Sequence, residues 1–141
     1  MKNKVLRIAG FMLLWLVTAF LVMIFVRQGW AKFSDSSGWA QAFVHWGYSR
    51  EFRIAIGVAE LAAAALLLYR RTAAYGALLI IAIMLGGIVT HVRADQLRHV
   101  RSEVMPIVLS AIVLTVRWPQ RLRIAAQAGG AVGSQPTGHS G

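Results

Sequence analysis

The feature that most constrains this chain is a succession of four apolar blocks, each bounded by cationic or polar residues. The blocks occupy residues 8–28, 52–69, 72–90 and 104–118. A helix of about 20 apolar residues crosses the hydrocarbon core of a bilayer, and a helix satisfies its own backbone hydrogen bonds there. The fourth block is shorter than the usual minimum of about 17 residues. We therefore predict an all-α fold, an integral membrane four-helix bundle.

The composition agrees with a membrane protein. Hydrophobic residues make up 57% of the 141 residues and charged residues 14%, whereas soluble domains average about 45–50% apolar and about 25% charged residues. This length allows one domain, which we place at residues 1–123. Residues 124–141 are rich in Gly and Ala and lack hydrophobic periodicity, so they are predicted to be a disordered tail.

The connections between the blocks carry further signals. A cleavable signal peptide is the alternative for the first block, but its apolar run exceeds the 7–15 residues of such peptides, so we interpret it as a retained span. Residues 91–103 are polar and of mixed charge, which predicts a loop with a helical turn. Pro106 follows at the start of the fourth block, where we expect it in the first helical turn.

The connection between the first two blocks is expected to contain a short interfacial helix. Residues 34–37 offer several helix N-caps, and Trp39, Phe43 and Trp46 follow at helical spacing. Such a helix would lie in the membrane interface with its aromatic side chains toward lipid. The alternative is an irregular loop that carries interfacial aromatic residues.

The charge pattern bears on partners and orientation. The net charge is +10, but the cations flank apolar blocks, where they meet lipid headgroups and leave no basic surface for nucleic acid. The expected partner is therefore the lipid bilayer. Four spans place both termini on one side, and the Lys and Arg residues of that side directly abut the spans. We predict a membrane protein with both termini in the cytoplasm.

Glu60 is the only acidic residue inside an apolar block. A carboxylate in hydrocarbon is costly unless it faces the bundle, pairs with a cation or takes up a proton. Arg27 and Lys32 lie at a comparable depth on the first helix and are the candidate partners. Gly29 precedes Lys32 by three residues, and Gly57 precedes Glu60 by three. These glycines would let the two helices approach closely and bring the charges together.

His91 ends the third block on the same side of the membrane, after Gly86 and Gly87, which are also expected to be packing glycines. The predicted ligand-binding or buried polar cluster therefore comprises Arg27, Lys32, Glu60 and His91. A purely structural ion pair is the alternative for this cluster. No metal site is expected, because His91 and His99 lack a third ligand and the chain has no cysteine. No covalently bound cofactor is expected either.

Several short motifs recur in a characteristic order between residues 8 and 118. They are Gly29-x-x-Lys32-Phe33, Trp39, Phe43, Gly47-Tyr48, Gly57-x-x-Glu60-Leu61, Leu85-Gly86-Gly87, His91 and Pro106. In this order and spacing the chain resembles the DoxX-like family of small four-span bacterial membrane proteins. The absence of cysteine sets it apart from members that use thiol chemistry.

The resemblance implies association with an electron-transfer complex, since the family is named after a subunit of a quinone-linked oxidoreductase. It favours an accessory subunit that binds a quinone or another lipid-soluble ligand, over a stand-alone enzyme, with a redox partner protein supplying the electron carrier. The alternative is a non-catalytic membrane assembly factor or scaffold. A homo-oligomer stays open. A transporter is disfavoured because no inverted repeat or pair of broken helices is evident.

Overall fold

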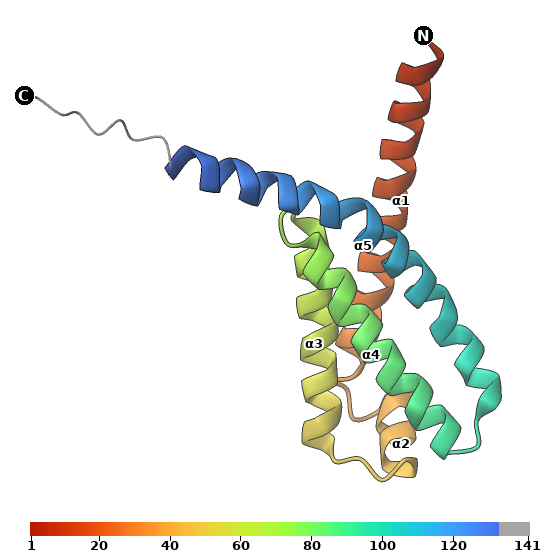
Figure 1. The fold of residues 1–141 in the computed structure, drawn as a ribbon. Helices are drawn as coiled ribbons and strands as arrows, with labels where there is room; N and C mark the ends of the chain where they lie inside the picture. Colours follow the sequence, from red (N-terminus) through yellow and green to blue (C-terminus); the bar gives the residue numbers. More distant parts are fainter. Residues whose placement is uncertain (133–141) are drawn as a thin grey trace, which may run out of the picture.

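The structure is a computed structural model that describes residues 1–132. Within these residues the chain forms five helices and no strand, so the fold is all-α as predicted. The helices are α1 (Lys2–Ala31), α2 (Gly38–His45), α3 (Arg50–Leu68), α4 (Ala73–Arg93) and α5 (Leu97–Val132). The four long helices form a bundle, and the short α2 lies at the end where α3 begins (Figure 1).

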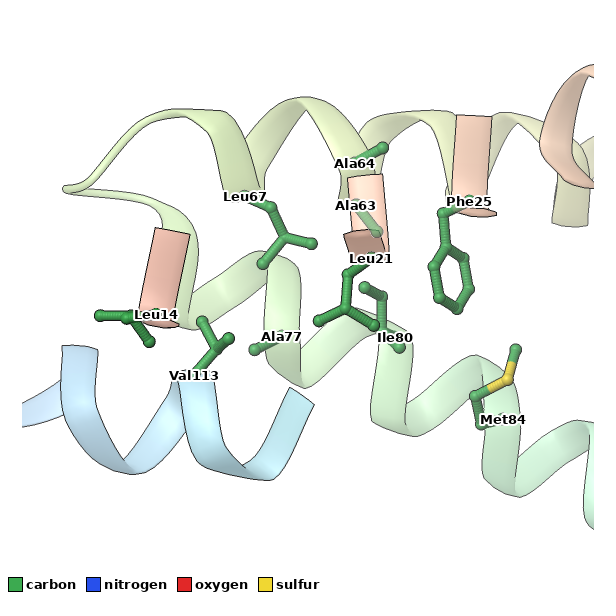
Figure 2. Packing of buried hydrophobic residues seen from close by; sticks show 10 residues of the cluster. All are labelled: Leu14, Leu21, Phe25, Ala63, Ala64, Leu67, Ala77, Ile80, Met84 and Val113. Carbon is green, nitrogen blue, oxygen red and sulfur yellow. The ribbon is translucent and has the colours of Figure 1, made fainter. Parts of the chain in front are cut away.

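The core of the bundle consists mainly of aliphatic and small residues, together with Phe25 and Met84. Helix α3 packs against α1 and α4, and α5 packs mainly against α4. Figure 2 shows the buried cluster running from Leu14 and Val113 at one end to Phe25 and Met84 at the other. The α3–α4 contact is especially close, because a Cβ atom on Gly76 would lie 2.8 Å from the carbonyl oxygen of Ala63. Small residues thus allow backbone-to-backbone packing, as is common in membrane bundles.

The outer surface of the bundle is apolar. Large hydrophobic side chains are exposed along most of its helices, a surface that is stable against lipid but not against water. Among the residues that the structure describes, three helical stretches are long and apolar enough to cross a membrane, namely Lys2–Ala31, Ala73–Arg93 and Leu97–Pro119. Helix α3 has 19 residues and completes the bundle. Because it carries three charged residues in its first turn and Glu60 further along, it is less apolar than these three stretches.

The predicted short helix after the first span is present as α2, and the loop alternative is wrong. Ser37 is its N-cap, and its side chain accepts a hydrogen bond from the backbone N–H of Ala40. The expected direction of the aromatic side chains was not correct. Phe43 is buried, and its ring packs against those of Trp39 and Trp46 and two further aromatic rings. The aromatic face therefore closes the end of the bundle instead of facing lipid.

Helix α5 is much longer than predicted. It begins at Leu97, inside the segment expected to be a loop, so Pro106 lies in the helix interior and not in the first turn. Helix α5 also continues past Pro119 to Val132, away from the bundle (Figure 1). The predicted disordered tail is thus helical up to Val132. Alanine has high helix propensity, and this segment is rich in it. The remainder, residues 133–141, lies outside the described residues.

Candidate ligand-binding site

Two glycines set the crossing of α1 and α3. A Cβ atom on Gly29 would lie 2.9 Å from the carbonyl oxygen of Gly57, and a Cβ atom on Gly57 would lie 2.9 Å from that of Gly29. Real Cβ atoms essentially never come this close to another heavy atom. Only glycine at both positions allows this approach, as the sequence predicted for both. The crossing places the next turn of each helix directly opposite the other.

One turn beyond the crossing, Lys32 and Glu60 form a buried ion pair. The Lys32 ammonium donates to both carboxylate oxygens of Glu60, at 2.8 and 2.9 Å. The two residues are only 2% and 1% exposed. The ammonium also lies 3.8 Å from the centre of the Trp39 ring, a cation–π contact supplied by α2. A buried charge is tolerated when its desolvation is offset by such partners.

A second pair lies between α4 and α5. The Nε2 atom of His91 is 3.4 Å from a carboxylate oxygen of Glu103. A Cβ atom on Gly87 would lie 3.3–3.4 Å from the same carboxyl group, so this glycine lets Glu103 lie against α4. Both pairs line the same cavity, so the Lys32 ammonium and the Glu103 carboxylate face a common space. Sequence reasoning did not include Glu103, because it stands in the segment expected to be a loop.

The His91 ring is held by further contacts. Its Nδ1 atom is 3.4 Å from the side-chain oxygen of Gln96, which also accepts a hydrogen bond from Trp46 Nε1 at 3.2 Å. The Trp46 ring stands perpendicular to the imidazole at 5.1 Å, and the His99 ring stacks on it at 5.4 Å. No group of three His, Asp or Glu residues within the described chain is arranged to hold a metal ion.

These polar groups line a cavity of about 580 Å³ at the α2 end of the bundle. Most of its wall is apolar or aromatic, and α1, α2, α3, α4 and α5 all contribute to it. The polar members of the wall are Gln28, Lys32, Tyr48, Glu60, Thr90, His91 and Glu103. Among them, the hydroxyl groups of Tyr48 and Thr90 are hydrogen-bonded at 3.0 Å. A volume of 300–1,000 Å³, apolar walls and a few convergent polar groups are typical of small-molecule sites.

Two of the predicted site residues lie differently from the others. Arg27 is exposed and is not part of the cavity wall. Gly86 does line the cavity, but no atom lies within 4 Å of where its Cβ atom would be, so it is not a packing glycine. It leaves open space in the wall instead. The structure thus brings together Lys32, Glu60 and His91, and it adds Glu103.

A second feature missed from the sequence holds the α1–α2 loop onto α3. Arg53 is buried and donates to the carbonyl oxygen of Ser34 at 3.1 Å and to the Asp35 carboxylate. Arg50 donates to the same carboxylate through two nitrogens, at 3.0 and 3.1 Å. Hydrogen bonds from Arg50 and then Arg53 lower the pKa of Asp35 below its usual value. This clamp fixes the loop that carries Lys32 into α2.

Comparison with known proteins identifies the family of the chain. The sequence pattern of the DoxX-like family matches residues 16–131, which include both glycines of the crossing and every charged residue of the cavity. No curated protein and no solved structure matches the chain. The match covers most of the sequence, and it agrees with the motifs from Gly29 to Pro106. The chain belongs to the DoxX-like family.

Proposed function

We propose that this membrane protein binds a lipid-soluble ligand with a polar head, a quinone, in the cavity at the α2 end, as an accessory subunit of a redox complex. The observation that carries the proposal is the buried Lys32–Glu60 pair in the wall of an otherwise apolar cavity of about 580 Å³. An apolar wall suits a ring and the start of an isoprenoid tail. Polar groups clustered on that wall suit the ring oxygens.

The polar residues differ in what they offer a quinone. The Lys32 ammonium has three N–H donors, and the two oxygens of Glu60 account for two of them. The third can donate to a ring oxygen. His91 and Glu103 form a pair that can hold a proton at Nε2 of the imidazole or on the carboxylate. The Tyr48 hydroxyl donates to Thr90, and the Thr90 hydroxyl donates to the carbonyl oxygen of Gly86, so this pair makes the wall more polar but offers the ligand acceptors only. A bound quinone supplies the redox chemistry, and these residues orient it and hold protons beside it.

A redox partner protein is part of the proposal. The chain has no cysteine to ligate an iron–sulfur cluster, so such a centre would come from another subunit. The proposed location is the inner membrane of a bacterium, with both termini in the cytoplasm. The cationic end of the bundle, with Arg70 and Arg71, supports this orientation through the positive-inside rule. A reporter that works only in the cytoplasm should be active when fused after Arg123. A reporter that works only outside the cytoplasm should be inactive at the same position.

The experiment is a titration of the purified full-length protein in nanodiscs with a short-tailed ubiquinone analogue. The matched substitutions are Glu60→Gln against Glu51→Gln, which is exposed on the same helix, and Lys32→Met against Lys4→Met, which is exposed on α1. We expect the two cavity variants to weaken binding about tenfold or more, the loss of a charge-assisted hydrogen bond, and the two controls to match the wild type.

A further variant separates binding from folding. Lys32→Met combined with Glu60→Leu replaces the ion pair by apolar side chains, a change that buried pairs often tolerate without loss of stability. A folded double variant that still binds the quinone as tightly as the wild type would refute the proposed site. Absence of quinone binding by the wild type, together with loss of a larger membrane complex when the protein is deleted, would instead establish the assembly factor or scaffold.

A further inference from the structure

The end of the bundle opposite the cavity carries cations without any acidic residue. The chain has five acidic residues, Asp35, Glu51, Glu60, Asp95 and Glu103. Glu60 and Glu103 line the cavity, and the other three lie in or beside the α1–α2, α2–α3 and α4–α5 connections, which are at the cavity end of the bundle. The opposite end contains the turn with Arg70 and Arg71, the N-terminal part of α1 with three cations, and α5 from Arg117 onward. An anion at this end must therefore come from outside the described chain.

Among the cations of this end that the structure describes, Arg117 is the one that is buried without a counter-ion. The residue is 3% exposed, and its Nε atom has no hydrogen-bond partner among the described residues. No carboxylate of the described chain forms an ion pair with it. The Trp15 ring lies near the guanidinium, with 5.8 Å between Cζ and the ring centre, and the positive charge of Arg70 repels it. Arg53, which also has an unpartnered Nε atom, differs because its terminal nitrogens bind Ser34 and Asp35.

An apolar groove lies beside the turn of α5 that carries Arg117. It has a volume of about 430 Å³ and is lined by Leu78 of α4 and by Leu114, Thr115, Trp118 and Pro119 of α5. Leu114 precedes Arg117 by three residues, so their side chains are neighbours on the helix surface. A buried guanidinium beside an apolar groove suits an anionic head joined to a hydrocarbon chain.

We propose that this end of the bundle is a binding site for a phospholipid. The phosphate binds Arg117, with Arg70 as the second cation, and an acyl chain lies in the groove between α4 and α5. A guanidinium group has a planar fork of N–H donors that matches two oxygens of one phosphate. The phosphate supplies the acceptor that Arg117 Nε lacks, and it offsets the repulsion between the two arginines. This site is independent of the proposed quinone cavity, which lies at the other end of the bundle.

The test measures binding to the delipidated full-length protein in a nonionic detergent by native mass spectrometry. The probes are a short-chain phosphatidylglycerol, a diacylglycerol with the same chains and no phosphate, and inorganic phosphate. We expect phosphatidylglycerol to bind, diacylglycerol to bind at least tenfold more weakly, and inorganic phosphate to bind weakest. Arg117→Gln and Arg70→Gln should each weaken phosphatidylglycerol binding about tenfold, whereas Arg98→Gln, an exposed arginine at the opposite end, should leave it unchanged.

Three results would overturn the proposal. Equal binding of diacylglycerol would show that the groove alone recognises the chains. Inorganic phosphate binding as tightly as the lipid would show a free-phosphate site. Unchanged phosphatidylglycerol binding by Arg70→Gln would show that the two arginines do not bind the phosphate together. Because Arg70 is exposed, this variant gives a result even if Arg117→Gln fails to fold. Leu78→Trp, which fills the groove from α4, should weaken lipid binding and leave phosphate binding unchanged.

Discussion

Adding one methyl group to Gly29 tests whether the close crossing of α1 and α3 positions the buried ion pair. In Gly29→Ala the new Cβ atom would lie 2.9 Å from the carbonyl oxygen of Gly57 and 3.0 Å from Leu61 Cγ, against 3.4–4 Å in an ordinary contact. The helices must therefore separate by several tenths of an ångström. Since Lys32 and Glu60 stand one turn further along the same two helices, their hydrogen bonds should lengthen as well.

The magnitude follows from a comparison with Gly10→Ala on the same helix, where no atom lies within 4 Å of the new Cβ atom. Both variants gain helix propensity of up to about 1 kcal/mol, so the difference between them isolates the clash. Overpacking of this kind costs about 1–3 kcal/mol. The assay is the free energy of unfolding in mixed micelles with increasing dodecyl sulfate. Equal stability of the two variants would refute the reasoning, because it would show that the helices are not in contact there.

Three further predictions concern the ion pair, the loop clamp and the cavity wall. Glu60→Gln should lower the free energy of unfolding by about 3–5 kcal/mol, because it leaves the Lys32 ammonium buried without its counter-ion. Lys32→Met combined with Glu60→Leu should be much closer to the wild type in the same assay. An equally large loss of stability in both variants would contradict this account. The lowered pKa of Asp35 means that its clamp stabilises the protein above an ordinary carboxyl pKa of about 3.8 and loses this effect as the pH falls below that value. Unfolding measured against pH should therefore show that the wild type is more stable than Asp35→Asn near neutral pH and that this difference disappears on acidification. A difference independent of pH would show that the stability of the clamp is not coupled to the protonation of Asp35. Gly86→Leu should weaken quinone binding while leaving the unfolding free energy nearly unchanged, because its side chain would extend into open space at the cavity wall; tight binding by this variant would place the ligand elsewhere.

The α1–α3 part of the site could be predicted because its determinants are local. A glycine three residues before Lys32 and another three residues before Glu60 indicate one face on each helix. The cost of an unpaired carboxylate in lipid then requires those faces to meet. Arg27 could have been excluded by the same geometry. It stands two residues from Gly29, about 200° around the helix at 3.6 residues per turn, and therefore points away from α3.

The α5 part of the site could not be predicted in this way. Residues 97–103 have mixed charges and only two apolar residues, Leu97 and Val100, so this segment alone does not distinguish a helix from a loop. Their helical form places Glu103 against Gly87 of α4. The direction of the aromatic face of α2 is a similar case. Helical spacing shows that Phe43 and its neighbours share a face, but lipid and a protein cavity are both apolar partners for it.

The most direct test of the central claim is to locate a bound quinone by photoaffinity labelling. The purified protein in nanodiscs would be irradiated with a short-tailed azidoquinone and digested, and the labelled peptides would be identified by mass spectrometry. We predict labels on the cavity wall, in α2 and around Phe52, Ile83 and Val89, and their loss when an excess of unlabelled quinone is added. Labelling confined to the lipid-facing surface of α1 and unaffected by that excess would contradict the claim that the cavity beside Lys32 and Glu60 is a quinone site.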